Sequence, residues 1–214
     1  MSKKDYFISS AKSLQLDIKV DYKSILEEAV NLKNRFIAYK AKPYSHQGWK
    51  SICLYGISEK HIDTWGDYGF KTAEEAGNAS IWTSISKDCP ATVNFLQTQF
   101  PCNKFGQVRF ELLESNGRVE EHSSSRIPVL ENIIIPLTDY KWIWDDGIEC
   151  NLKAGSAISM NIHYFHSITN TSNIDQYCLV INRHDSTNEW KSIVDKACVD
   201  QQVTGEYVLY DIVN

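Results

Sequence analysis

The second half of the chain consists of short runs of hydrophobic residues that alternate with polar ones. From position 106 onward these runs are rich in Ile, Val, Tyr and Trp and are separated by Gly, Asn, Asp and Pro, the pattern of β-strands joined by turns. The predicted strands are 107–114, 119–123, 129–137, 141–144, 148–152, 157–161 and 177–182, with a turn at 115–117. So many short strands in one stretch predict a β-sandwich or a jelly-roll barrel.

The first half carries helical signals around one predicted strand. Within 14–40, hydrophobic residues recur at the spacing of one helix face: Tyr22, Ile25, Leu26, Ala29, Val30, Leu32 and Phe36. A strand is predicted over 47–56, followed by a loop that contains Gly66, Gly69 and Gly77. Pro90 suits the first turn of a helix, predicted over 91–99. A further helix is predicted over 190–198 and a last strand over 206–213.

Length and charge narrow the class of protein. The 214 residues are expected to form one domain, with a helical and loop layer over about 1–105, a jelly-roll core over about 106–185 and a final helix and strand over about 186–214. A net charge of −5 disfavours nucleic acid as a partner. No hydrophobic run approaches the roughly 20 residues of a membrane span. Because no hydrophobic segment follows the basic N-terminal residues, we expect a cytoplasmic protein and no membrane partner.

Six scattered cysteines include no C-x-x-C pair, and we expect them to be reduced and mostly buried rather than metal-bound or disulfide-bonded. Among the histidines, His46, His61 and His184 lie in polar stretches typical of solvated loops. His122 and His166 lie instead on or near predicted strands, 166 − 122 = 44 residues apart. Strands at that separation are often neighbours in a jelly roll, where two imidazoles could hold a divalent metal. On spacing alone, two unrelated histidines at strand ends remain an alternative.

Two further features concern the faces of these strands. His163 and His166 are three residues apart, an odd offset that sends them to opposite faces of a strand, and the order in the segment favours His166 as the inward residue. Tyr140, Trp142 and Trp144 share one face, where they form either the core or the wall of a pocket.

An ordered series of motifs carries a resemblance to a known family. The series consists of 85–96, Val108-Arg109-Phe110-Glu111-Leu112-Leu113, Asn116-Gly117-Arg118-Val119, His122, the run 129–137 that ends in Pro-Leu, and then Gly155, Asn161, His166, Asn170 and Ser172. It resembles the iron(II)- and 2-oxoglutarate-dependent oxygenases, and within them the aspartyl/asparaginyl β-hydroxylase-like group, over about 49–182. The resemblance implies a mainly β, cupin-like double-stranded β-helix (jelly roll) with flanking helices and an N-terminal helical layer.

The resemblance also implies a metal centre. Carried over by position, His122 and His166 would be the two ligands of Fe(II). Ser124 stands where the superfamily commonly has a carboxylate ligand. That replacement removes one anionic ligand and should lower the affinity for iron.

The site implied for the cosubstrate 2-oxoglutarate departs further from the family pattern. Gln176 stands in place of the arginine that pairs with the distal carboxylate, and Asn132 begins the segment in place of an Arg-x-His motif. A buried dicarboxylate needs a compensating cation. Arg126, just after His122, is a candidate. Arg109 is another, with an exterior salt bridge as its alternative role.

The implied function is an iron(II)- and 2-oxoglutarate-dependent dioxygenase that hydroxylates an amino-acid, peptide or small-acid substrate. Two alternatives remain open from the sequence. One is a catalytically inactive jelly-roll binding or interaction protein, which the neutral residues at the cosubstrate positions favour. The other is a cupin-type isomerase or lyase that uses the metal without 2-oxoglutarate. The sequence does not indicate an oligomeric state.

Overall fold

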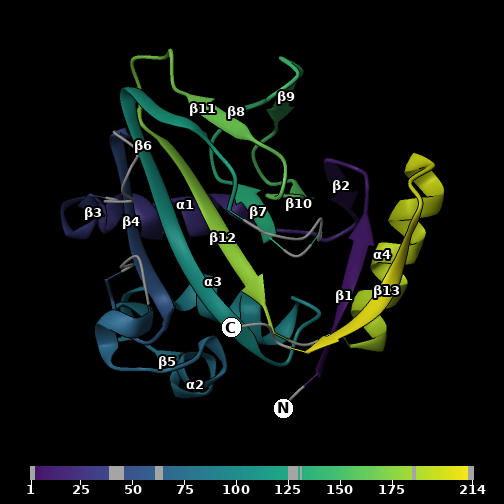
Figure 1. The fold of residues 1–214 in the computed structure, drawn as a ribbon. Coiled ribbons are helices and arrows are strands. Elements are labelled where there is room, and N and C mark those ends of the chain that lie inside the picture. The colour runs from purple at the N-terminus through teal and green to yellow at the C-terminus, as the bar shows by residue number, and fades with distance from the viewer. Residues whose placement is uncertain are drawn as a thin grey trace.

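The computed structural model describes residues 3–38, 46–60, 65–124, 130, 132–184 and 187–211 (Figure 1). Its α-helices are α1 (Tyr22–Asn31), α2 (Ala73–Ala79), α3 (Pro90–Thr98) and α4 (Asn188–Gln201). Its 3₁₀ helices are η1 (Lys33–Arg35), η2 (Trp65–Tyr68) and η3 (Ser84–Asp88). Its strands are β1 (Lys3–Ser9), β2 (Ser13–Leu16), β3 (Ile37–Ala38), β4 (Gln47–Gly56), β5 (Ile81–Trp82), β6 (Phe105–His122), β7 (Asn132–Pro136), β8 (Tyr140–Trp144), β9 (Glu149–Leu152), β10 (Ala157–Met160), β11 (His166–Thr169), β12 (Gln176–Arg183) and β13 (Gly205–Asp211).

The strands form an antiparallel, curled sheet that confirms the predicted mainly β jelly roll with flanking helices. Its order is β2-β10-β7-β12-β6-β11-β8-β9, and β4 pairs with β6, β3 and β5. The long strand β6 belongs to both layers, because its first part pairs with β12 and its last part with β11. In Figure 1, β6 turns over at one end of the molecule and runs back beside β11.

The bend in β6 depends on two residues at the turn predicted from the sequence. Asn116 has a positive φ of 58°, which asparagine tolerates better than most side chains do. At Gly117 a Cβ atom would lie 2.7 Å from the carbonyl oxygen of Glu114 and 2.7 Å from Leu113 Cδ1. Only glycine fits this close approach, so this turn fixes where the strand passes from one layer to the other.

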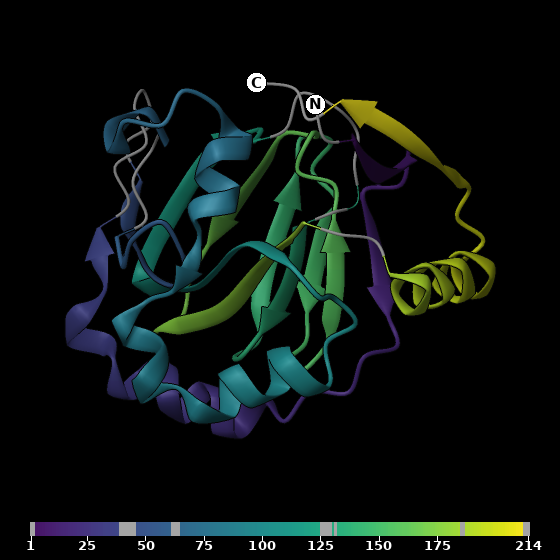
Figure 2. The ribbon, with the colours of Figure 1, turned by 90° about the horizontal axis from the view of Figure 1, so that it is seen from below.

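Two hydrophobic clusters lie on the two faces of the sheet. Strand β12 shows the division, because its residues alternate: Tyr177, Leu179 and Ile181 belong to the outer cluster under the helices, and Cys178 and Val180 to the inner one. In Figure 2, α1 and α3 lie together across one side of the sheet.

The packing of α1 on α3 includes a partly buried polar contact. Glu28 of α1 accepts hydrogen bonds from the backbone N–H groups of Ala91 (2.6 Å) and Thr92 (3.0 Å) at the start of α3. A carboxylate is favourable there, because the first N–H groups of a helix have no partner within the helix.

The two ends of the described chain pair with each other. Strands β1 and β13 form a separate two-stranded antiparallel sheet in which Lys3 lies opposite Asp211. This sheet lies beside α4 (Figure 1), and the carbonyl oxygen of Phe7 in β1 accepts from the N–H of Leu130, just before β7. The sequence pattern predicted the last strand but not β1, which begins with the charged residues Lys3, Lys4 and Asp5.

The helical stretch predicted within 14–40 is shorter than its hydrophobic pattern. Strand β2 occupies Ser13–Leu16, and α1 ends at Asn31. Phe36 lies after the polar turn η1 in an extended conformation (φ −64°, ψ 139°), where it packs edge-on against Tyr177 with ring centroids 6.1 Å apart. Phe36 is buried, as the hydrophobic pattern predicted. It lies beyond the helix, however, and is buried by contact with Tyr177 of β12.

The loop predicted around Gly66, Gly69 and Gly77 is wrong in part, because it contains η2 and α2. Helix α2 begins at a capping threonine: Thr72 Oγ1 accepts from the N–H of Glu75 at 3.1 Å. The sequence signal for this cap, a threonine followed three residues later by glutamate, was present. None of the described helices is long and apolar enough to cross a membrane.

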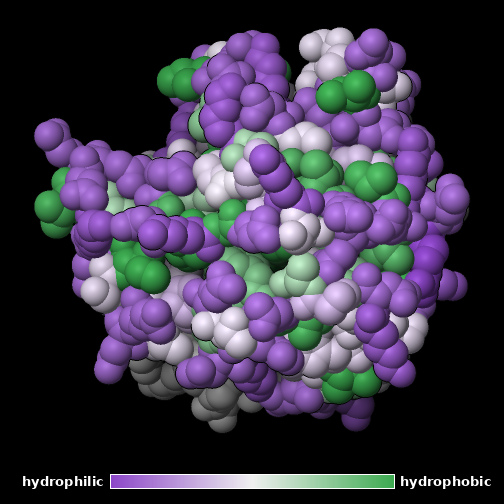
Figure 3. Space-filling model, turned by 180° about the vertical axis from the view of Figure 1, so that it is seen from behind, coloured by the Kyte–Doolittle hydropathy of each residue, from purple (hydrophilic) through white to green (hydrophobic). Residues whose placement is uncertain are grey.

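The surface seen in Figure 3 is mainly hydrophilic, with hydrophobic residues scattered among the polar ones in small groups. Scattered exposed hydrophobic residues are normal for a folded protein.

Candidate metal centre and its cavity

Two histidines meet where the two layers of the jelly roll join. His122 is the last residue of β6 and His166 the first of β11, and the two lie directly opposite each other in the register of the strands. Their ring centroids are 4.5 Å apart. The residues are 8% and 3% exposed, so both imidazoles lie inside the fold.

Both rings are held through the same nitrogen atom. His122 Nδ1 is 2.8 Å from the carbonyl oxygen of Glu120, and His166 Nδ1 is 2.9 Å from that of Tyr164. Since a carbonyl can only accept, each Nδ1 carries the proton and donates it. The unprotonated nitrogen of each neutral ring is therefore Nε2, the atom that remains for a metal.

Burial keeps one of these rings uncharged. Desolvation lowers the pKa of His166 to about 4, with a smaller contribution from the nearby His122, so His166 is neutral near pH 7. Trp142 stacks on its ring at a centroid distance of 4.4 Å and an angle of 21°. The predicted face of Tyr140, Trp142 and Trp144 is buried, and Trp142 serves as both core and cavity wall.

A third histidine lies beside the pair, which the sequence did not indicate. His46 was predicted to be a solvated loop residue, but its ring centroid is 5.5 Å from that of His122. Its Nδ1 accepts from the backbone N–H of Glu120 at 3.1 Å. The carbonyl oxygen of Glu120 also accepts from His122 Nδ1. The backbone of Glu120 is therefore hydrogen-bonded to both imidazoles. Burial, and then His122, lower the pKa of His46.

Ser124 occupies the position at which the superfamily commonly has a carboxylate ligand, so that position has no acidic side chain. Ser124 lies at the rim of the cavity, where its N–H donates to the carbonyl of Ile162 at 2.8 Å. Glu121 is exposed. The described part of the chain contains no cluster of three or more His, Cys, Asp or Glu side chains suited to a metal. The donor set is therefore the Nε2 atoms of two imidazoles, a set that fits one divalent first-row metal with positions left for other ligands.

A cavity of ≈ 200 Å³ adjoins the histidines. Its lining combines hydrophobic groups with several polar side chains and consists of Trp49, Gln107, Arg109, Glu111, His122, Ser124, Asn132, Ile134, Trp142, Ile162, His166, Ile168, Val180 and Asn182. This mixture is typical of a site that orients a small polar molecule.

Arg109 lies inside this cavity, so the exterior salt bridge considered for it is wrong. Its side chain is 12% exposed and pairs with the 7% exposed Glu111, with Nη2 to Oε1 at 2.8 Å. The Nε atom donates to the same oxygen at 2.8 Å, and Nη1 donates to Gln107 Oε1 at 3.0 Å.

The residues predicted to bind the cosubstrate do not all lie at the cavity. Asn132 lines the cavity. Gln176 is not among the lining residues, and its Nε2 donates to the carbonyl of Asp139 at 3.1 Å. Arg126 lies outside the described residues, as does His61. His163 lines a different surface hollow, beside Ile8 and Gly205.

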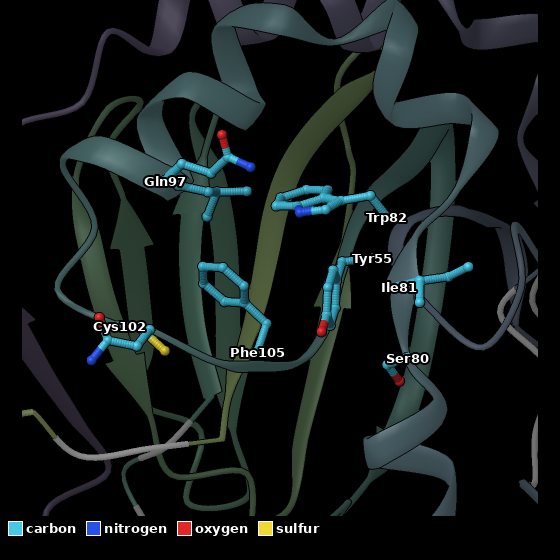
Figure 4. Close-up of a pocket in the computed structure, with 9 residues that line it drawn as sticks. Tyr55, Ser80, Ile81, Trp82, Gln97, Cys102 and Phe105 are labelled. Atoms are coloured by element: carbon cyan, nitrogen blue, oxygen red, sulfur yellow. The ribbon is translucent and has the colours of Figure 1, made fainter.

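A second hollow contains none of the predicted site residues. It measures ≈ 490 Å³ and is lined by Tyr55, Trp82, Phe105, Gln97 and others. Figure 4 shows the Tyr55, Trp82 and Phe105 rings grouped together with Gln97 nearby. These rings pack on one another, with Tyr55 and Trp82 centroids 5.2 Å apart, so they form a continuation of the core.

The chain is similar to one protein-family model and to several solved structures. No curated protein matches the chain. Among solved structures, a Pseudomonas putida prolyl-4-hydroxylase is 11% identical over 82% of this chain and 94% of its own, with a TM-score of 0.42. An oxidoreductase of the 2OG-Fe(II) oxygenase family from Burkholderia pseudomallei is 12% identical over 76% and 81%, with a TM-score of 0.47. The sequence model of the aspartyl/asparaginyl beta-hydroxylase family matches residues 17–185. The chain therefore belongs to the aspartyl/asparaginyl β-hydroxylase family.

Proposed function

We propose that the protein is an iron(II)- and 2-oxoglutarate-dependent hydroxylase in which His122 and His166 bind the metal. The observation that carries the proposal is the buried pair of imidazoles, each with Nδ1 fixed by a backbone carbonyl. A ligand fixed in this way presents Nε2 in one orientation and is a better donor. When bound, iron(II) with 2-oxoglutarate and O₂ supplies the oxidising chemistry for hydroxylation of a C–H bond.

The remaining residues prepare the site. Trp142, stacked on His166, holds that ring in its plane and excludes water from one side. The buried environment keeps His166 neutral and able to coordinate. Ser124 leaves the third protein position without a charge. We therefore expect weaker retention of iron than in an enzyme with a carboxylate ligand.

The substrate class that we propose is an amino acid, a peptide side chain or a small acid. The cavity of ≈ 200 Å³ is open at the rim where Ser124 lies and suits a small polar group.

The test is succinate release by purified protein with Fe(II), 2-oxoglutarate and O₂, together with metal analysis. We expect stoichiometric metal and succinate release, and loss of both in His122→Ala and His166→Ala. His163→Ala, outside the cavity, is the matched control. Metal uptake without succinate would favour a cupin-type isomerase or lyase, and failure to take up metal would favour a binding module.

A further inference from the structure

The wall of the cavity away from the histidines is built from rows of side chains across three strands. Asn182 of β12 lies opposite Asn132 of β7 on one side and Gln107 of β6 on the other. These three amides form one row, which we call the amide row. The next row on the same face holds Val180 and Arg109, and all five residues line the cavity.

The amide row has hydrogen-bonding capacity that the protein does not use. Asn182 Oδ1 is buried and has no partner among the described residues. Asn132 is only 9% exposed. Trp142, across the cavity, also has a buried Nε1–H with no acceptor in the described part of the chain. Buried polar groups in folded proteins are normally satisfied, so unused groups around one cavity indicate a polar ligand.

Arg109 brings a positive charge to the end of the amide row. Glu111 accepts from Nε and Nη2 and therefore occupies one edge of the guanidinium fork. Nη1 points the other way along the strand and donates to Gln107. A planar fork of this kind recognises carboxylates better than any other side chain does.

Gln176, which stands where the family has the arginine that binds 2-oxoglutarate, makes a contact outside this row. Gln176 lies on the same face of β12 as Val180 and Asn182 but opposite Leu113, two rows beyond Arg109. Its side-chain N–H group is bonded to the carbonyl of Asp139, and it carries no charge to offset that of a buried carboxylate.

We propose that Arg109, with the amide row, is the carboxylate anchor of this cavity and that it binds a distal carboxylate of 2-oxoglutarate. The inference rests on the proposed function, because it assigns a binding residue to the same site. The anchor has moved from β12 to the neighbouring strand β6, where Arg109 replaces in function the arginine missing at Gln176.

Glu111 has two opposite effects in this arrangement. In the empty cavity it compensates the charge of Arg109, since a buried, unpaired guanidinium is strongly unfavourable. When a ligand carboxylate approaches, Glu111 competes for the same guanidinium and repels the incoming anion. Neutralising Glu111 should therefore tighten ligand binding, a result that a purely structural ion pair does not predict.

The test is calorimetric titration of 2-oxoglutarate into protein loaded with Mn(II), which replaces iron without turnover. We expect Glu111→Gln to lower Kd by at least about threefold, because a competing carboxylate is removed while Gln still accepts from Arg109. The double variant Arg109→Gln/Glu111→Gln removes both charges without leaving one unpaired, and its Kd should rise at least about tenfold. Arg118→Gln, an exposed change beyond the bend of β6, and Gln176→Ala should stay within about twofold of the wild type.

Each outcome bears on a specific claim. Thermal melting of the variants, with and without Mn(II), establishes that each one is folded and metal-loaded. Wild-type affinity in the folded double variant, or a tenfold loss in Gln176→Ala, overturns the anchor but leaves the proposed function standing. A wild-type protein that binds Mn(II) but neither binds 2-oxoglutarate nor releases succinate with iron overturns both.

Discussion

Acidification of the metal-free protein should destabilise it through His166. Its pKa is lowered from 6.5 to about 4 because the ring is buried, so the folded state favours the neutral imidazole. In the unfolded chain the same ring binds a proton below about pH 6.5. The unfolded state therefore binds more protons between these two values, and stability falls as the pH decreases across that window.

The size of this effect follows from the difference in pKa. A difference of about 2.5 units, at about 1.36 kcal/mol per unit, gives a loss of about 3 kcal/mol by pH 4 relative to pH 7. The full contribution of the neutral ring is present above about pH 6.5, and His166 causes no further loss well below pH 4. Such a loss is a large part of the stability of a typical domain.

Urea denaturation of chelator-treated protein between pH 7.5 and 4.5 measures this dependence. His166→Gln keeps a side chain that can donate to the carbonyl of Tyr164 but cannot titrate, and His163→Gln, outside the cavity, serves as the control. Between pH 7.5 and 4.5, we expect His166→Gln to lose about 2.5 kcal/mol less stability than the wild type and His163→Gln to behave like the wild type. Equal slopes for the wild type and His166→Gln would refute the assignment of a buried, neutral His166.

Three other predictions concern metal affinity and the bend of β6. Replacement of His122 by alanine should weaken metal binding by more than about 100-fold, which exceeds the usual cost of losing a hydrogen bond to a metal ligand. Competition with a chelator measures the affinity, and a near-wild-type value would exclude His122 as a ligand. His46→Ala removes the acceptor of the Glu120 N–H and should weaken binding about tenfold, with His46→Gln closer to the wild type; equal affinities would show that His46 does not position His122. Gly117→Ala should lower the free energy of unfolding by about 1–3 kcal/mol, because its Cβ would meet the Glu114 carbonyl; unchanged urea denaturation would show that the bend relaxes freely.

The strands of the jelly roll could be predicted because their signals are local. Alternation, turn residues and Pro90 gave most of the strands and α3 within a few residues. The proximity of His122 and His166 followed from the usual spacing of strands in such a fold, and the structure places them opposite each other. Their role as metal ligands stays a prediction that the metal assays test.

The orientation of Arg109 could not be predicted, for a physical reason. Along 107–112, the hydrophobic residues Val108, Phe110 and Leu112 pack under the helices, and the polar residues face the other way. In an ordinary half-buried strand the polar face is the solvent face. In this fold that face encloses a cavity, and alternation alone does not distinguish the two. The contact of His46 with His122 was missed for a related reason, because it joins segments that are distant in sequence.

The pairing of β1 with β13 has a consequence for synthesis of the protein. Strand β1 is translated before the other described strands, but its partner β13 appears only after all of them have been made. During synthesis, β1 therefore lacks its partner strand β13 and has an unpaired edge that chaperones or neighbouring chains can contact. Pairing of β1 with β13 therefore comes late and joins the two most widely separated strands of the described structure, which favours a slow last folding step. Shortening the last strand should thus expose the first one and promote aggregation of newly made chains.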